Sequence, residues 1–212
     1  MSLTSTTDHS QANASGRRAT CPRCHLPLSS CLCRWVVCTD NQWPVLVLQH
    51  PAEAAHAKGS ARLLGLSLQR VRCVVVGSEG DDALEAALGP PGHSLLLFPA
   101  EAPTPGLAPR AEGGINLAPG PAQLVLLDGT WRQARQMLRA SPRLQALPRL
   151  PLADPPPSRY AIRRAQQPQH QRSTLEAACL ALGQLEGRPG HYAPLLQAFS
   201  GWVAEVAARA RR

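Results

Sequence analysis

The stretch that decides the fold is QLVLLDGTWRQARQML, residues 123–138. A short apolar run ends abruptly in Asp128-Gly129-Thr130-Trp131, and an amphipathic, arginine-rich segment follows. A buried strand that delivers an acid, a glycine and an aromatic residue to the start of a helix is a common way to build a site in an α/β protein. The segment therefore predicts a strand, a turn and a helix, and the turn is either a site or only a capped helix start.

Three further apolar runs, residues 45–48, 71–76 and 95–98, are continuous rather than alternating. Continuous runs are typical of parallel strands that are covered on both faces. Helix-like segments follow at residues 51–64, 81–88, about 173–186 and about 192–209. Repeated strand–helix units predict an α/β domain with a mostly parallel sheet. Residues 99–121, rich in proline, glycine and alanine, are expected to be a loop, and residues 151–172 form a second irregular stretch.

Charge is distributed unevenly along the chain. The formal net charge is +8, from 22 basic and 14 acidic residues. Residues 1–127 carry nine of each sign, whereas residues 128–212 carry thirteen arginines against five acids. A GC-rich genome accounts for arginine in place of lysine but not for this asymmetry. Arginine concentrated in one half is typical of polyanion binding, so the pattern favours a nucleic acid as partner.

Neither a membrane span nor a secretory signal is expected. No apolar run approaches the roughly 18 residues that a spanning helix needs. The first residues, MSLTSTTDHSQANASGRR, lack the apolar core of a signal peptide. We therefore expect a cytoplasmic protein.

Four of the seven cysteines lie within thirteen residues: Cys21, Cys24, Cys31 and Cys33. Without a secretory signal, such a cluster favours metal ligands over disulfides. Four thiolates complete a tetrahedral, structural Zn²⁺ site and leave no position for water, and an Fe–S cluster is the alternative. We expect a disordered tail over residues 1–18, a zinc-binding hairpin module over 19–39 and the α/β domain over 40–212.

The turn after the 123–128 run holds the first candidate site residues. Asp128 is expected where the strand end opens into a crevice, and Gly129 permits a tight turn or the close approach of a ligand. Thr130 begins a capping box, and Trp131 belongs either to the core or to the site. The arginines of the following helix share one face, which is either solvated or contacts phosphates; they are Arg132, Arg135 and Arg139.

Two other positions have strong structural explanations. Ser173-Thr174-Leu175-Glu176 fits a capping box that opens an apolar helix, although the same helix start favours a carboxylate or phosphate ligand. His50 follows the first strand without a Ser or Cys partner nearby, so we expect a hydrogen-bonded structural residue. No Walker or GxGxxG phosphate loop is present.

In combination, these motifs resemble the DTW-domain family. The resembling segments are CPRCHLPLSSCLC, LQHPAEA, LLLFP, LVLLDGTWRQARQML, SPRLQALPRL, SRYAIRR and STLEA, in that order over about residues 21–182. The family letters D, T and W match Asp128, Thr130 and Trp131, with Gly129 interposed.

The resemblance implies a tRNA-uridine aminocarboxypropyltransferase. Such an enzyme moves the 3-amino-3-carboxypropyl group of S-adenosylmethionine to N3 of a tRNA uridine and releases 5′-methylthioadenosine. It also implies a SPOUT-like fold with a knotted C-terminal part. Asp128 would be the general base or would orient the substrate. Two alternatives stay open: an S-adenosylmethionine-dependent RNA methyltransferase, and a non-catalytic zinc-ribbon protein that binds RNA.

The same resemblance assigns the remaining site residues. The cofactor is expected to contact Leu97, Phe98, Pro99, Gly129, Thr130, Trp131, Ser173, Thr174 and Glu176. The tRNA is expected to contact Arg132, Arg135, Arg139, Arg159, Arg163 and Arg164. For the last three, contact with the cofactor carboxylate is the alternative. No obligate protein partner is expected.

Overall fold

The computed structural model describes residues 19–54, 60–76, 81–99, 122–152 and 172–209. The predicted tail over residues 1–18 lies outside the described residues. So does nearly all of the two stretches predicted to be irregular, 99–121 and 151–172. Within the described helices, none is long and apolar enough to cross a lipid bilayer.

The centre of the fold is a five-stranded parallel sheet with the order β2-β1-β4-β3-β5. The strands are β1 (Val45–Gln49), β2 (Val71–Val75), β3 (Ser94–Leu97), β4 (Gln123–Asp128) and β5 (Arg149–Leu150). The four apolar runs of the sequence are the first four strands, which confirms the predicted α/β class and the parallel sheet. β5 was not predicted, because two residues are too few to show a periodic pattern.

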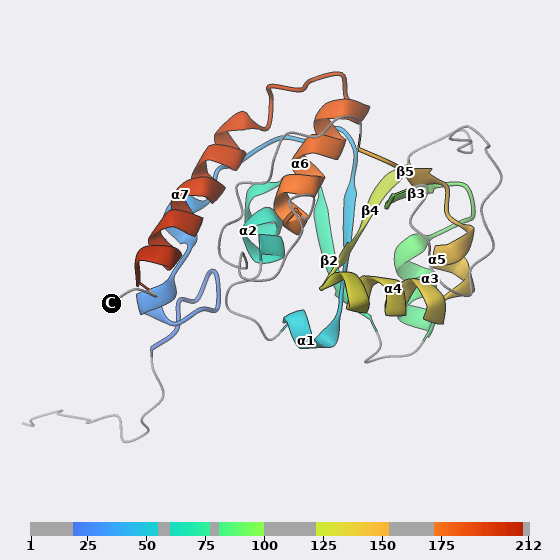
Figure 1. Ribbon diagram of the computed structural model, residues 1–212, viewed down its shortest axis with the longest axis horizontal. Helices are drawn as coiled ribbons and strands as arrows, with labels where there is room; N and C mark the ends of the chain where they lie inside the picture. The colour runs from blue at the N-terminus through green and yellow to red at the C-terminus, as the bar shows by residue number, and fades with distance from the viewer. Residues whose placement is uncertain (1–18, 55–59, 77–80, 100–121, 153–171, 210–212) are drawn as a thin grey trace, which may run out of the picture.

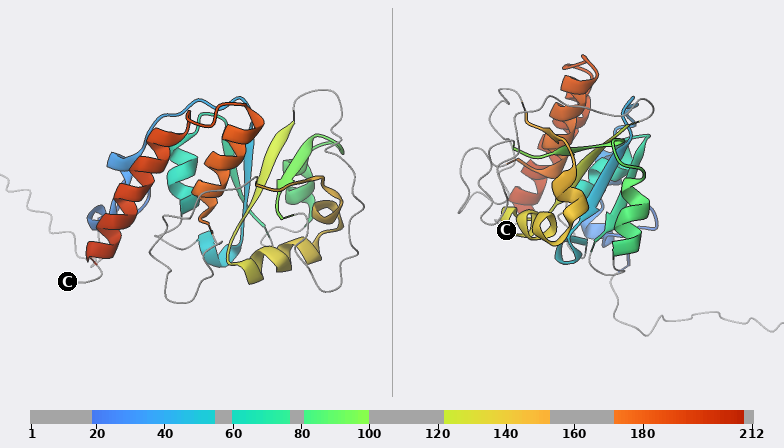
Figure 2. Two further views of the ribbon diagram at one scale, coloured as in Figure 1. Left: turned by 45° about the horizontal axis from the view of Figure 1, so that its top comes forward. Right: turned by 90° about the vertical axis from the view of Figure 1, so that its right-hand side faces the viewer.

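Helices cover both faces of the sheet (Figures 1 and 2). Buried side chains of α2 (Ser60–Ser67), α6 (Thr174–Leu185) and α7 (Ala193–Arg209) pack on one face. Those of α3 (Asp81–Leu88), α4 (Trp131–Ala140) and α5 (Pro142–Ala146) pack on the other. The short helix α1 (Pro51–Ala54) follows β1, and the predicted helix over 51–64 is thus described as α1 and α2 with residues 55–59 outside.

Each central strand supplies apolar side chains to both layers. In β1, Val45 and Val47 join the cluster of α2, α6 and α7, whereas Leu46 and Leu48 join that of α3, α4 and α5. All four are at most 2% exposed. A strand buried on both faces has no position for a polar side chain, which is why its sequence is a continuous apolar run.

The cysteine-containing module lies beside α7, at one end of the molecule (Figure 1). An antiparallel bridge between Thr20 and Pro27 closes its first turn, and the 3₁₀ turns η1 (Leu28–Ser30) and η2 (Cys33–Trp35) follow. The Trp35 ring occupies the space where a side chain at Gly201 of α7 would lie. Arg34 also forms an ion pair with Glu205 of α7. The module is therefore held by ring packing and charge together.

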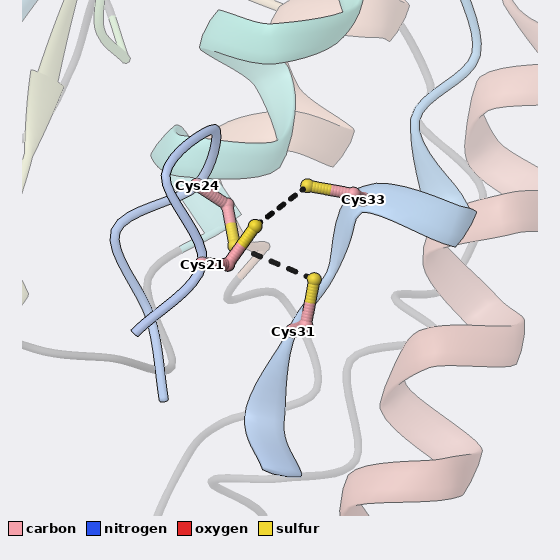
Figure 3. A group of neighbouring side chains, drawn as sticks. All are labelled: Cys21, Cys24, Cys31 and Cys33. Atoms are coloured by element: carbon pink, nitrogen blue, oxygen red, sulfur yellow. Dashed lines mark hydrogen bonds between the residues drawn. The ribbon is translucent and has the colours of Figure 1, made fainter. Parts of the chain in front are cut away.

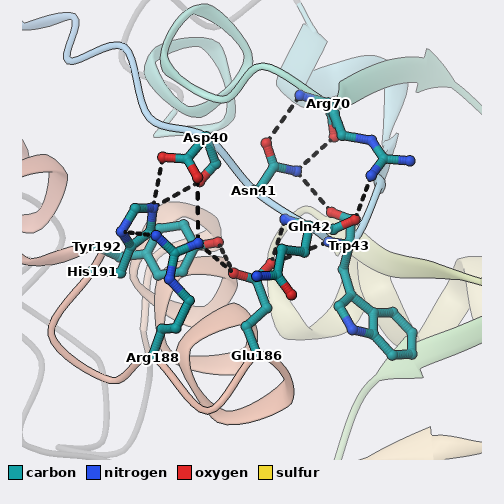
Figure 4. Close-up of polar contacts among 9 residues, drawn as sticks. All are labelled: Asp40, Asn41, Gln42, Trp43, Arg70, Glu186, Arg188, His191 and Tyr192. Atoms are coloured by element: carbon teal, nitrogen blue, oxygen red, sulfur yellow. Dashed lines mark hydrogen bonds and ion pairs between the residues drawn. The ribbon is translucent and has the colours of Figure 1, made fainter.

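A polar network closes the amino edge of the sheet (Figure 4). The Glu186 carboxylate accepts hydrogen bonds from the backbone N–H of Gln42 at 2.8 Å and of Trp43 at 3.1 Å, and from the Tyr192 hydroxyl at 2.8 Å. Burial and this carboxylate raise the pKa of Tyr192. The network ties the segment before β1 to the turn between α6 and α7, and it lies at the sheet edge opposite Asp128.

The clearest test of this core is Leu46→Ala, since Leu46 is fully buried in β1. Loss of a buried leucine side chain leaves a cavity and should lower the free energy of unfolding by about 2–5 kcal/mol. Urea titration followed by circular dichroism measures this. The matched control is Leu28→Ala, because Leu28 is 59% exposed and should change stability by less than about 0.5 kcal/mol. Equal losses for the two variants would contradict the core described here.

Candidate functional site

The side chain of Asp128 is the centre of the candidate site. It ends β4, is 6% exposed, and lies opposite Gln49, the last residue of β1, in the parallel register. Its Oδ2 accepts a hydrogen bond from the Gln49 side-chain amide at 2.7 Å, and its Oδ1 accepts one from the Thr174 hydroxyl at 2.5 Å. A buried carboxylate needs such partners. A carboxylate has about four lone-pair positions, so the two bonds leave capacity to accept a further proton.

The strand order explains why the site forms here. The chain passes from β1 outward to β2, then crosses to β3 and returns to β4 beside β1. In open parallel sheets, ligands bind beyond the carboxyl ends of the strands where the order reverses. Gln49 and Asp128 lie at that point. The topology places Asp128 at the point where the strand order reverses, while the crevice beside it and its catalytic role stay predictions.

Both predicted capping boxes are confirmed. The Thr130 hydroxyl accepts from Gln133 N–H at 3.3 Å, and the Gln133 side chain accepts from Thr130 N–H at 2.6 Å. Ser173 and Glu176 form the equivalent pair at the start of α6. The Glu176 carboxylate also accepts from the Ser173 hydroxyl at 3.0 Å. Helix capping accounts for the residue types at these positions, and their contact with a cofactor stays a prediction.

Capping at α6 has a consequence for the site. Since Ser173 is the N-cap, Thr174 is the first helical residue, and its hydroxyl reaches Asp128. Sequence reasoning grouped Thr174 with the cofactor residues, and the structure places it against the carboxylate. His50 is hydrogen-bonded as expected. Its ring Nδ1 accepts from Ala52 N–H at 3.2 Å, and its backbone N–H donates to the Asp128 carbonyl at 2.9 Å.

Aromatic rings and arginines gather next to this turn. Trp131 and Phe98 meet edge to face with ring centroids 5.6 Å apart. The guanidinium of Arg135 lies 5.9 Å from the Trp131 centroid, and that of Arg149 lies 5.3 Å from the Phe98 centroid. Such stacked cations stabilise the rings and present positive charge at the carboxyl edge. Phe98 is buried, whereas Trp131 is only half-buried.

The three arginines predicted to share one face of α4 differ in their exposure to solvent. Arg132 and Arg139 are exposed, whereas Arg135 is half-buried. The Nε of Arg135 is fully buried and finds no hydrogen-bond partner in the part of the chain that the structure describes. A buried donor beside an open aromatic ring is what an acceptor-rich ligand would satisfy.

The structure places the other predicted residues as follows. Leu97 ends β3 and Pro99 is exposed, with its carbonyl accepting from Arg149 at 3.4 Å. At Gly129 there is little room for a side chain, because an added Cβ would lie 3.0 Å from the Gln133 Cβ. Arg159, Arg163 and Arg164 lie outside the described residues, so their predicted contacts stay predictions.

A cavity of about 340 Å³ lies between β2 and α2 on the other side of Gln49. Its polar lining is Gln49, Glu53 and Arg62. The other lining residues, which we call its floor, are Ala61, Gly65, Val71 and Cys73. Sequence reasoning missed this cavity. Glu53 is buried although its side chain ends in a carboxyl group. The sequence does not show this burial, because it results from the packing of α1, α2 and β2.

The four clustered cysteines converge as predicted (Figure 3). Their Sγ atoms all lie within 4.8 Å of one another, with Cys21 and Cys33 at 3.6 Å and Cys24 and Cys31 at 3.7 Å. Zinc–sulfur bonds of about 2.3 Å in a tetrahedron place sulfurs about 3.8 Å apart. The cluster can therefore bind one metal ion, and its geometry fits zinc.

Local hydrogen bonds prepare one of these ligands. Backbone N–H groups of Cys24 and Arg23 lower the pKa of Cys21 to about 6. These hydrogen bonds favour the thiolate, the form that binds metals. Burial raises the pKa of Cys33 to about 12, and a bound cation would favour its deprotonation.

Removal of one ligand tests the metal site. Cys24→Ser should reduce bound zinc from one equivalent to well below half and lower the melting temperature, because structural zinc contributes directly to folding. Elemental analysis and thermal unfolding measure both. Cys38→Ser is the matched control, since Cys38 is exposed and lies outside the cluster. Iron together with visible absorbance in the purified protein would show that the cysteines bind an Fe–S cluster instead of zinc.

Fold and site together define a class: a parallel-sheet α/β protein with a four-cysteine module and a hydrogen-bonded aspartate at the carboxyl edge. The family model described as "DTW domain" matches residues 18–207. The chain belongs to the DTW-domain family. No solved structure matches it.

Three curated relatives are similar over most of the chain or a large part of it. The "tRNA-uridine aminocarboxypropyltransferase 2" of Drosophila melanogaster is 33% identical over 188 residues, which cover 84% of this chain and 71% of the relative. The Mus musculus protein of the same name is 32% identical, over 80% of this chain and 57% of the relative. The "tRNA-uridine aminocarboxypropyltransferase A" of Arabidopsis thaliana is 29% identical, over 62% and 54%. The chain spans little more than half of the last two proteins.

Proposed function

We propose that this protein transfers the 3-amino-3-carboxypropyl group of S-adenosylmethionine to N3 of a tRNA uridine. The observation that carries the proposal is the position of Asp128, the aspartate of the family motif, at the sheet switch point. The names of the curated relatives support it.

The reaction asks for a proton acceptor at a fixed position. Uridine N3–H is a weak acid and must lose its proton before N3 attacks carbon. Asp128 has lone pairs left after its bonds to Gln49 and Thr174, and these bonds hold its oxygens in place. Asp128 accepts the N3 proton or orients the base.

The residues present also fit the cosubstrate. When bound, S-adenosylmethionine supplies an electrophilic γ-carbon: the N3–Cγ bond forms as the Cγ–S bond breaks, and 5′-methylthioadenosine and a proton are released. The half-buried Trp131 offers a ring face that suits a sulfonium cation. The Arg135 Nε, which has no hydrogen-bond partner among the described residues, offers a buried donor beside that ring. Leu97, Phe98, Pro99, Gly129, Thr130, Ser173, Thr174 and Glu176 complete the proposed cosubstrate contacts.

The proposed RNA contacts lie on the arginine-rich second part of the chain. Arg132 and Arg139 are exposed on α4, which begins at the turn that carries Asp128. Such side chains bind phosphates without reading the sequence. Arg159, Arg163 and Arg164 belong to the same proposal, and so does a SPOUT-like fold with a knotted C-terminal part. Residues 19–39 are proposed as the zinc module and 40–212 as the catalytic domain.

Asp128→Asn tests the chemistry while preserving the shape of the side chain. Loss of a positioned proton acceptor should reduce product formation about 100- to 10,000-fold, with little change in melting temperature. Mass spectrometry of tRNA nucleosides and release of methylthioadenosine measure the product. Asp40→Asn, at the opposite sheet edge, should retain activity. Formation of methylated uridine with S-adenosylhomocysteine by the unmodified protein would instead identify an RNA methyltransferase.

The RNA surface is tested by the double variant Arg132→Gln with Arg139→Gln. If each arginine neutralises one phosphate, the slope of log affinity against log salt should become shallower by roughly 1.5–2. Filter binding of tRNA at several salt concentrations measures the slope. Arg70→Gln is the control, because Arg70 is exposed at the amino edge. An unchanged slope in the double variant would remove α4 from the RNA surface.

A further inference from the structure

The cavity between β2 and α2 shares a wall with the Asp128 site. Gln49 lines the cavity and at the same time donates to Asp128 Oδ2 at 2.7 Å. Both groups face the α2 and α6 layer: Gln49 continues the alternation of Val45 and Val47, and Asp128 is held by Thr174 of α6. The charge of Asp128 also contributes, after burial, to raising the pKa of Cys73 on the cavity floor. The two spaces are therefore adjacent and electrostatically connected.

The polar lining of the cavity gathers at its end near Asp128. Gln49 ends β1, Glu53 lies in α1, and Arg62 lies in the first turn of α2. Because α2 runs back from the carboxyl edge toward the start of β2, its first turn lies at that edge. The cavity thus offers a carboxylate and a guanidinium close to the proposed reaction centre, above a small, largely apolar floor.

We propose that this cavity binds the amino acid end of the transferred group, with Arg62 on the carboxylate and Glu53 on the ammonium. The inference rests on the proposed function. A zwitterion carries both charges that complement this lining, whereas a neutral uracil ring carries neither. Binding both charges would fix the limb so that its γ-carbon, rather than the methyl group, faces the nucleophile.

Arg62 is positioned by the cysteine module. Its Nη1 donates to the Cys24 carbonyl at 2.7 Å, and a guanidinium has five N–H donors, so this bond orients the group without exhausting it. Cys24 is one of the four clustered cysteines. The module would therefore hold a cosubstrate-binding arginine in place, in addition to its contacts with α7.

Among the described residues, Arg135 is the competing candidate for the carboxylate. Its guanidinium lies over Trp131, whose apolar contacts belong to the α3, α4 and α5 layer. The Asp128 carboxylate faces the opposite layer, and no carboxylate is described beside Arg135 to complement an ammonium. The geometry consequently favours Arg62.

Calorimetry with three ligands tests the proposal without relying on activity. The ligands are S-adenosylmethionine, its decarboxylated form, and 5′-methylthioadenosine, which lacks the limb. The unmodified protein should bind S-adenosylmethionine about 10- to 100-fold more tightly than the decarboxylated form, as expected for charge-assisted hydrogen bonds. Arg62→Met should reduce this ratio to near one and leave methylthioadenosine affinity unchanged, which also shows that the variant is folded.

Two further variants complete the experiment. Glu53→Gln should remove the preference for S-adenosylmethionine over an analogue that lacks the α-amino group. Arg72→Met is the matched control and should keep every ratio, since Arg72 lies on β2 but donates to the Ala87 carbonyl on the opposite face. Retention of the carboxylate preference in Arg62→Met, or its loss in Arg135→Met instead, would overturn the inference and leave the proposed function standing. Failure of the unmodified protein to bind S-adenosylmethionine would overturn both.

Discussion

Two hydrogen bonds to one buried carboxylate hold the carboxyl edge of this protein together. Asp128 ends β4, Gln49 ends β1 and Thr174 begins α6, so a single side chain joins two strands and a helix. Burial of a charged group without partners costs free energy, so the buried position of Asp128 depends on these hydrogen bonds. The β1–β4 register is fixed by the same contact. A shift of one residue would move Gln49 to the other face and leave Asp128 without its amide partner.

The cysteine module belongs to the same structure as the sheet. Cys21, Cys24, Leu26 and Leu32 join the apolar cluster formed by α2, α6 and α7. Arg62 reaches from α2 to the Cys24 carbonyl, and Trp35 packs against α7 at Gly201. A metal ion in the cluster would therefore stabilise helices far from its ligands in sequence. This coupling gives the module a role in the shape of the proposed site that its spacing alone does not suggest.

The two faces of the sheet carry different parts of the proposed site. The face of α2 and α6 carries Asp128, its partners and the cavity with Glu53 and Arg62. The other face carries the aromatic pair and the exposed arginines of α4. Because α4 starts at the turn beside Asp128, one short segment connects both. The proposed cosubstrate contacts lie on both faces, because Trp131 and Phe98 belong to one and the cavity to the other, whereas the exposed arginines proposed to bind RNA lie on α4.

The sequence by itself determined the first four strands, the cluster of four cysteines that can bind a metal ion, and the two helix caps. These depend on local patterns: continuous apolar runs, cysteine spacing, and side chains that bond their own backbone three residues away. It also pointed to Asp128, through the turn and the family motif. The strand order, the partnership of Gln49 and Thr174 with Asp128, and the cavity around Glu53 and Arg62 were decided only by the tertiary structure. They join residues up to 79 positions apart (Gln49 and Asp128), and only the packing of β1, β4, α2 and α6 brings such residues into contact.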